Sequence, residues 1–231
     1  AYSFDKYSSV EQSAVQMDPA IWNQFAEFGW LGQPIGEAAG GYGGDAVDTM
    51  LIAQGLGAGL VLEPFTASII FAGKLLELSG GAEANESLMN DVVEGRSQIA
   101  VAYTERKGRY SAQWCECSAA EGRISGQKTA VLNGPNASHF IVSARNSGKA
   151  GETAGISLYL VAADAAGLTR KDYRVLGGGC ASEVSLNNVE GKLLGKAGEG
   201  FNALEHALDY AIASACAEAL GATDALSVVR R

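Results

Sequence analysis

The sequence is poor in several residue types, and each scarcity excludes a class of protein. Only four of the 231 residues are proline, and no apolar run approaches the ~20 residues of a membrane-spanning helix. Basic residues are the minority, 17 against 26 acidic ones, which leaves a net charge of -9. Nucleic-acid binding needs clustered Lys and Arg, so no such partner is expected. With 47% hydrophobic and 19% charged residues, the chain is typical of a soluble globular protein.

Cysteine and histidine, the usual soft metal ligands, are also rare. The chain has four cysteines, which are Cys115, Cys117, Cys180 and Cys216. A C-x-C pair without a second ligand pair does not predict a metal site, and we expect reduced thiols, as in an intracellular protein. The alternating sequence around this pair predicts that both side chains face the same side of one strand. The two histidines, His139 and His206, are far apart and are expected to be structural or exposed.

The first ~95 residues have the pattern of a helical bundle. Asp18-Pro19 predicts a helix start, and apolar residues at helical spacing follow until Gly29. A glycine-rich loop spans 36–44, and an apolar stretch spans about 47–62. Glu63-Pro64 opens another predicted helix, and a further one around 88–93 ends at Gly95.

After residue 96 the period changes from helix to strand. Short β-type runs occupy 99–103, 140–143, 156–161 and 184–186, with turn signals such as Asn133-Gly134 beside them. Crossover helices are missing, so we expect an antiparallel barrel or sandwich rather than a parallel sheet. From Gly200 the helical period returns and continues to the end of the chain. The Gly198-Glu-Gly200 turn lacks the strand and the Lys-Ser/Thr of a phosphate loop, so an ordinary helix start is the favoured interpretation.

Short segments in chain order carry a family resemblance. They are Trp22-Asn-Gln-Phe-Ala-Glu-Phe-Gly-Trp-Leu31, Pro34-Ile-Gly-Glu37 with Gly40-Gly-Tyr-Gly43, Glu94-Gly95 with Ala102-Tyr-Thr-Glu105, Gly126-Gln-Lys128 with Val131-Leu-Asn-Gly134, and Leu193-Leu-Gly195 with Gly198-Glu-Gly-Phe201. Together they resemble the acyl-CoA dehydrogenase family. The stretches Glu105–Tyr110 and Cys216–Gly221 are most similar to the small subunit of pimeloyl-CoA dehydrogenase-type enzymes.

The resemblance implies an α+β fold in three parts. Residues 1–96 would be an N-terminal all-α domain, residues 97–196 a middle β-domain, and residues 197–231 the first helix of a C-terminal all-α domain. Family members begin with a further helix and continue past residue 231, so we expect the chain to be the front part of such a protein. A tetramer, homomeric or formed with a homologous subunit, is expected to cover its apolar helix faces.

The resemblance also implies FAD-dependent α,β-desaturation of an acyl-CoA, with an electron-transfer flavoprotein as the oxidant of the flavin. It places Tyr103, Thr104, Ala130 and Leu132 at the flavin and Arg109, Tyr110 and Asp209 near the substrate. Similar bacterial subunits act in the cytoplasm, in the degradation of fatty acids, dicarboxylic acids, steroids or aromatic compounds.

Several positions depart from the family pattern. Ala130 and Leu132 stand where an aromatic residue and a threonine often cover the flavin, and Arg106-Lys-Gly-Arg-Tyr-Ser111 replaces a turn of small residues. Ala211 and Ile212 stand where some members carry a Glu base followed by Arg, so we expect the catalytic base to lie outside this chain. A second hypothesis therefore stays open, a partner subunit without flavin that supports a catalytic homologue. A third, an unrelated helical-plus-β binding protein, predicts neither flavin nor acyl-CoA binding.

Overall fold

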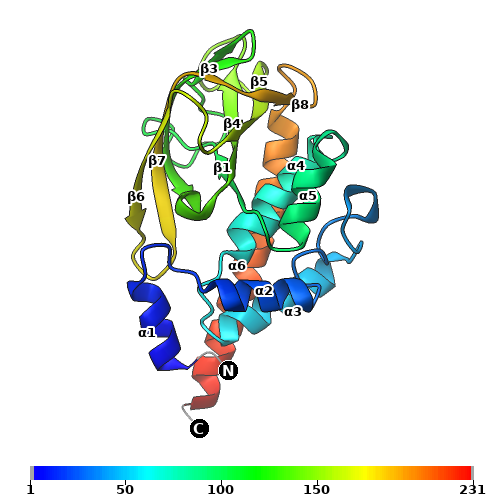
Figure 1. Ribbon diagram of the computed structural model, residues 1–231, viewed down its shortest axis with the longest axis vertical. Helices are drawn as coiled ribbons and strands as arrows, with labels where there is room; N and C mark the ends of the chain where they lie inside the picture. The colour runs from blue at the N-terminus through cyan, green and yellow to red at the C-terminus, as the bar shows by residue number, and fades with distance from the viewer. Residues whose placement is uncertain (1–2, 230–231) are drawn as a thin grey trace.

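Helices occupy the first part of the computed structural model, which describes residues 3–229 (Figure 1). They are α1 (Phe4–Gln12), α2 (Pro19–Glu27), η1 (Glu37–Ala39), α3 (Ala46–Ala58), η2 (Phe65–Gly73), α4 (Lys74–Leu78), η3 (Glu83–Asn85) and α5 (Glu86–Val93). Helix α2 begins as its sequence predicts, because the Asp18 side chain accepts the Ala20 N–H at 2.8 Å and Pro19 needs no partner for its nitrogen. Helix α3 begins with a reciprocal capping box between Asp45 and Asp48.

The helix predicted to open at Glu63-Pro64 starts there, but its first nine residues are a π-helix, η2. This segment is buried on most of its surface, from Phe65 to Gly73. Because nearly every side packs against another element, tertiary contacts rather than an amphipathic period set its backbone geometry. Such wide turns occur frequently at functional sites.

Strands fill the middle of the chain, as the change of period predicts. They are β1 (Ile99–Ala102), β2 (Ser118–Ala120), β3 (Arg123–Leu132), β4 (His139–Arg145), β5 (Ile156–Ala162), β6 (Leu168–Arg174), β7 (Cys180–Glu190) and β8 (Lys192–Leu194), with the 3-10 turn η4 (Gly134–Asn136) between β3 and β4. They form one sheet in the order β6-β7-β3-β2-β4-β5-β8.

The expectation of antiparallel strands in the middle of the chain is confirmed, and a few parallel pairings accompany them. The pairs β3–β7, β4–β5, β5–β8 and β6–β7 are antiparallel, but β1 pairs with β4 in parallel and β2 meets β4 in parallel at one residue pair. The parallel pair arises because the chain leaves the helices through β1 and returns beside it only after the β2–β3 hairpin. The fold is therefore α+β with a mostly antiparallel sheet.

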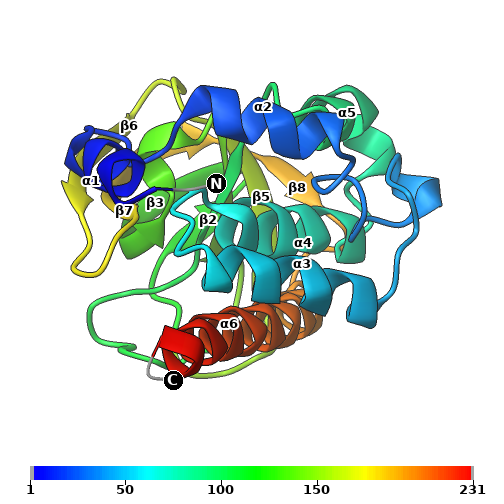
Figure 2. The same ribbon diagram turned by 90° about the horizontal axis from the view of Figure 1, so that it is seen from below.

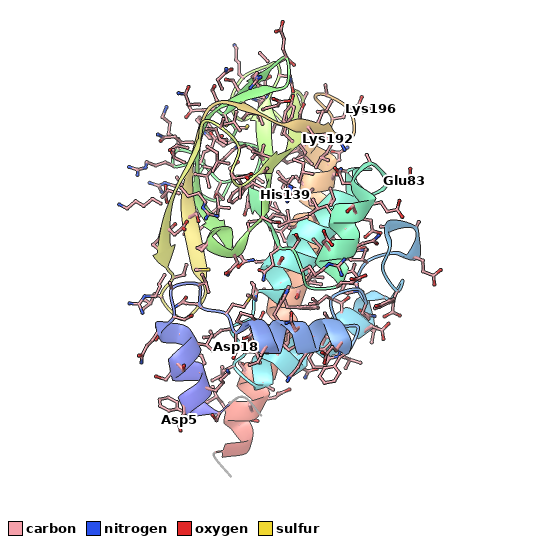
Figure 3. The ribbon with its side chains drawn as sticks, in the orientation of Figure 1. Asp5, Asp18, Glu83, His139, Lys192 and Lys196 are labelled. Carbon is pink, nitrogen blue, oxygen red and sulfur yellow. The ribbon has the colours of Figure 1, made fainter. Side chains whose placement is uncertain are left out.

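Helix α6 (Phe201–Val229) runs from the β-unit along the helical unit, beside α3 and α4 (Figures 1 and 2). Lys192 on β8 ties the two units together, since its ammonium donates to the carbonyl of Ala84 at 2.7 Å and to the Asn85 side chain at 2.9 Å (Figure 3). No helix within residues 3–229 is long and apolar enough to cross a membrane.

Candidate functional site

A buried ion pair lies in the interior of the β-unit. Lys128 on β3 is fully buried, and its ammonium donates to Glu105 Oε1 at 2.8 Å and to Ser143 Oγ at 3.0 Å. The Glu105 carboxylate also accepts the backbone N–H groups of Glu116 at 2.6 Å and of Cys117 at 3.0 Å. A dry ion pair persists when further hydrogen bonds satisfy both partners, as they do here. The pair fastens the segment after β1 to β3 and to the segment before β2.

The ends of β1 and β3 are joined next to this ion pair, one residue away from Glu105 and Lys128 in the sequence. The Thr104 hydroxyl donates to the Thr129 carbonyl, and the Thr129 N–H donates to the Thr104 carbonyl at 2.9 Å. The register of β3 against β7 shifts between Lys128 and Val131, which is a β-bulge, and Ala130 inside it has φ +50°. Bulges and left-handed non-glycine residues concentrate beside ligand sites, because the surrounding structure must hold their strain.

The structure brings the four residues predicted to contact the flavin onto these two strand ends. Tyr103 is half-buried, meets Phe71 edge-on with 5.5 Å between the ring centroids, and burial raises the pKa of its phenol. Thr104 is half-buried, Ala130 is exposed, and the Leu132 side chain is 53% exposed. Their role at a flavin stays a prediction.

The three residues predicted near the substrate are placed differently. Arg109, with φ +50°, and the fully exposed Tyr110 lie in the loop between β1 and β2. Asp209 is exposed on α6. None of the three lines the cavity described next. Their role in binding substrate also stays a prediction.

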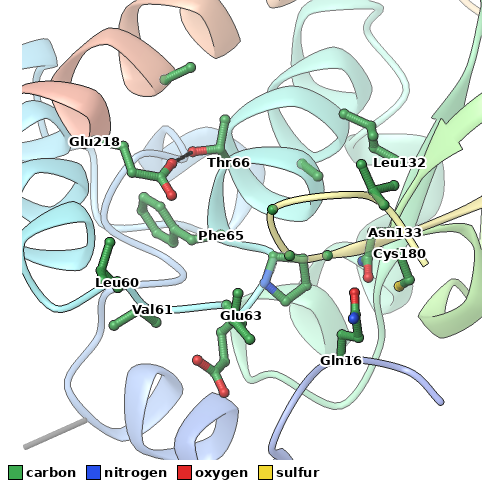
Figure 4. A pocket seen from close by; sticks show the side chains of 18 of the residues that line it. Gln16, Leu60, Val61, Glu63, Phe65, Thr66, Leu132, Asn133, Cys180 and Glu218 are labelled. Carbon is green, nitrogen blue, oxygen red and sulfur yellow. Dashed lines mark hydrogen bonds between the residues drawn. The ribbon is translucent and has the colours of Figure 1, made fainter. Parts of the chain in front are cut away.

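A cavity of about 510 Å³ lies beside the end of β3 (Figure 4). It is bounded by the α1–α2 and α3–η2 connections, the start of η2, the β6–β7 hairpin and the C-terminal half of α6. Apolar side chains make most of its wall, among them Leu60, Val61, Phe65 and Leu132. A concave, mainly apolar cavity with a few polar groups is the usual form of a small-molecule site.

The polar groups on the α6 side of this cavity form a small cluster. The hydroxyls of Thr66 and Ser214 lie 2.8 Å apart, and Thr66 Oγ1 donates to Glu218 Oε2 at 3.3 Å. Burial raises the pKa of the Glu218 carboxyl, and the Thr66 hydrogen bond partly offsets this. Sequence analysis did not identify this cluster. Glu218 follows Ala211 by seven residues and therefore shares its helix face, a periodicity that could have indicated it.

The C-x-C pair forms no reactive site. Cys115 and Cys117 are buried on the same side of the chain, as predicted, but they lie in an extended segment just before β2 rather than in a strand. Burial raises the pKa of both thiols, that of Cys117 to about 12. Neutral, enclosed thiols are poor nucleophiles and poor metal ligands.

The sequence of this chain is similar to known proteins. Residues 5–96 match the family "Acyl-CoA dehydrogenase, N-terminal domain". Caffeyl-CoA reductase-Etf complex subunit CarC of Acetobacterium woodii is 24% identical over 92% of this chain and 59% of its own length. Acyl-CoA dehydrogenase FadE27 of Mycobacterium tuberculosis is 25% identical over 76% of this chain and 45% of its own length. This chain therefore spans about half the length of these two relatives.

Solved structures agree with the sequence comparisons. A variant of the Tcur3481-Tcur3483 steroid ACAD superposes with a TM-score of 0.83 at 27% identity, over 97% of this chain and 59% of the other. The ChsE4-ChsE5 complex from Mycobacterium tuberculosis gives a TM-score of 0.82 at 20% identity, with the same coverage of 97% and 59%. The segment order, the helix–sheet–helix fold and these matches lead to one conclusion: residues 5–96 form an acyl-CoA dehydrogenase N-terminal domain, and the chain has the fold of the acyl-CoA dehydrogenases.

Proposed function

We propose that this chain is a subunit of an FAD-dependent acyl-CoA dehydrogenase that desaturates an acyl-CoA between its α- and β-carbons. One observation carries the proposal: β3, which is joined to the end of β1 next to the Lys128–Glu105 pair, ends at Leu132 in the wall of a mainly apolar cavity. In this proposal the chain consists of an N-terminal helical domain up to residue 96, a β-domain up to residue 196 and the first helix of a second helical domain.

The residues at the strand ends fit an isoalloxazine ring through apolar contact. Ala130 and Leu132 present exposed apolar surface, and Val131 between them in the sequence is buried. The Thr104 hydroxyl already donates to a carbonyl, so it is left as an acceptor for a ring N–H. When bound, FAD supplies the two-electron redox chemistry, and the protein positions it.

Within the proposed reaction, this chain binds and orients the acyl group. The apolar wall of the cavity would bury the acyl chain of the substrate away from water. Leu132 would limit how closely the acyl chain approaches the strand ends. Ala211 and Ile212, which match the positions of the base in some members, cannot accept a proton. We therefore assign the base that removes the α-proton to a residue outside this chain. An electron-transfer flavoprotein would reoxidise the flavin in the bacterial cytoplasm.

A second candidate is a partner subunit without flavin that stabilises a catalytic homologue. It is favoured by Leu132, which has no hydroxyl for the ring. It is also favoured by two similar structures, Tcur3481-Tcur3483 and ChsE4-ChsE5, each of which joins two differently named proteins. Under either candidate the chain belongs to an oligomer, proposed to be a tetramer of identical or homologous subunits.

The test is FAD retention by the full-length protein, purified with its partner, and by two leucine variants. Leu132→Asp places a charge on the exposed apolar face, and we expect it to lose bound flavin. Leu193→Asp is the control, since Leu193 is also a partly exposed leucine, 38% against 53%, but lies on β8 at the edge of the sheet, away from β3. Equal flavin absorbance in wild type and Leu132→Asp would refute the proposed site. Flavin-free wild type would favour the second candidate.

A further inference from the structure

One wall of the cavity carries a carboxyl group that the protein uses only in part. Glu218 on α6 is half-buried, and its Oε2 accepts the Thr66 hydroxyl at 3.3 Å, the dashed line in Figure 4. Its other oxygen, Oε1, has no hydrogen-bond partner within residues 3–229 and is accessible to solvent. A molecule in the cavity therefore has an acceptor within reach.

Two hydroxyls hold this carboxyl group in place. The hydroxyl of Ser214, a residue that is 2% exposed, lies 2.8 Å from Thr66 Oγ1. Because Thr66 donates its own proton to Glu218, Ser214 is the donor of that pair, and the bonds run from Ser214 through Thr66 to Glu218. Thr66 lies on η2 and the other two residues lie on α6, so regular elements fix the group before a ligand arrives.

The charge of Glu218 is not balanced from within the described part of the chain. No Lys, Arg or His of residues 3–229 lines the cavity. Burial raises the pKa of the Glu218 carboxyl, and no charged neighbour contributes to the shift. The second acidic residue of the wall, Glu63, is engaged separately, since its Oε1 accepts the Asp18 N–H at 3.1 Å. A carboxylate that an apolar wall desolvates without a counter-ion costs free energy, and such groups are typical of ligand sites.

The end groups that a ligand can present to Glu218 differ in what they offer. An ammonium would donate to Oε1 and supply the counter-ion, and charge-assisted hydrogen bonds are the strong ones. A hydroxyl would donate but leave the charge unbalanced. A methyl group would do neither, and a carboxylate would add a like charge. The site therefore favours an ammonium.

Building on the proposed function, we infer that the cavity selects acyl-CoA substrates whose acyl chain ends in an ammonium group, with Glu218 Oε1 as its acceptor. Figure 4 draws Leu132, which is proposed to face the flavin, and Glu218 on different sides of the cavity. The ammonium would thus bind away from the reacting carbons, and Glu218 is a specificity-determining residue rather than a catalytic one.

The experiment measures binding without turnover. The ligands are 3-thia-acyl-CoA thioesters, which lack the β-hydrogens that the flavin would take, ending in methyl, hydroxyl or ammonium at equal length and made in several lengths. Calorimetric titration at neutral pH into the full-length protein with its partner should give the ammonium ligand at least ~10-fold tighter binding than either competitor. In Glu218→Gln, which keeps an acceptor for Thr66 but loses the charge, the preference should vanish, and Glu218→Asp should keep part of it. The control is Glu205→Gln, the same change at an exposed position of α6 outside the lining, and it should keep the preference.

Each outcome decides one of the two claims or both. Equal binding of the three ligands by the wild type, or tightest binding of the methyl or hydroxyl ligand, would overturn the inference alone, even if Glu218→Gln fails to fold. An ammonium preference that persists in Glu218→Gln, or that Glu205→Gln also abolishes, would overturn it as well, because the charge responsible would not be that of Glu218. Binding of none of the ligands would overturn both the inference and the proposed function. An ammonium preference without desaturation of the corresponding acyl-CoA would support the selectivity of the cavity and refute the proposed reaction alone.

Discussion

Lys128 links separate segments of the β-unit through its bonds to Glu105 and Ser143. Its ammonium is sealed from solvent and is balanced by one carboxylate, that of Glu105. Lys128→Met removes the cation and leaves the carboxylate buried and uncompensated. We expect a loss of about 3–5 kcal/mol in the free energy of unfolding, measured by urea denaturation. Adding Glu105→Gln removes the stranded charge and should recover part of this loss. A Lys128→Met variant as stable as wild type would contradict this account.

Glu218 makes stability depend on pH in a stated direction. Burial raises the pKa of its carboxyl in the folded protein above the unfolded value, so folding favours the protonated form. That stabilisation is complete below the unfolded pKa and is lost as pH rises through the folded pKa. Glu218→Gln keeps a polar, uncharged group, so the variant should melt at a higher temperature than wild type at pH 7.

The comparison of Glu218→Gln with wild type should change with pH. The two melting temperatures should converge below about pH 4.5, where the wild-type carboxyl is protonated in both states. Thermal melts from pH 4 to pH 8, followed by circular dichroism, measure the difference. A constant difference across this range would mean that Glu218 does not titrate as its burial requires.

At the scale of elements, the contact between α3 and α6 depends on two glycines. A Cβ added to Gly57 would lie 1.8 Å from the Glu218 carbonyl oxygen, and one added to Gly221 would lie 1.9 Å from the Gln54 carbonyl oxygen. Both obstacles are backbone, so the helices themselves would have to move apart. Gly57→Ala and Gly221→Ala should each destabilise the protein by about 1–3 kcal/mol, the usual cost of overpacking.

The same helix supplies the control for this prediction. Gly55 lies one position before Leu56 on α3, and a Cβ added there meets nothing within 4 Å. Gly55→Ala should therefore stabilise the protein by about 0.5–1 kcal/mol, because alanine loses less backbone entropy in a helix. Urea titration of the three variants decides the matter. Equal effects at all three positions would exclude close helix packing as the cause.

Period and capping were sufficient to predict most elements from the sequence. Helix α2 was indicated by Asp18-Pro19, and β4 and β5 were indicated by runs of buried apolar residues. Strand β3 did not appear as a run, because its buried face includes Lys128 and its course is bent by two register shifts. Strand β6 is almost entirely exposed, so its sequence has no hydrophobic alternation to reveal it.

The candidate site was predictable only in part. Family resemblance indicated Thr104 and Leu132, and the structure joins their segments through the hydrogen bond from the Thr129 N–H to the Thr104 carbonyl. The cavity joins segments that are distant in sequence, from Gln16 to Glu218, and only the tertiary fold brings them together. Gln16 is buried and Glu218 is half-buried, and a pattern of residue types does not predict that a polar side chain will be buried.

At the scale of the whole molecule, apolar side chains are exposed on two neighbouring helices. Helices α3 and α6 expose large apolar side chains, which include Val47, Met50, Leu51, Ile212, Leu220 and Leu226. Exposed apolar surface on neighbouring helices marks an interface, which agrees with the proposed oligomer. The chain also spans only 59% of the length of the matched CarC relative. The proposed function assigns the base and the remaining flavin contacts to other parts of the assembly.

The most direct test of the central proposal is the visible spectrum of the full-length protein, purified with its partner and mixed anaerobically with an acyl-CoA. The account predicts flavin bands in the isolated protein, loss of those bands as substrate is oxidised, and a 2-enoyl-CoA in equal amount. A protein that carries flavin but whose spectrum no acyl-CoA changes would contradict the proposed dehydrogenation, and a preparation without flavin would contradict the cofactor.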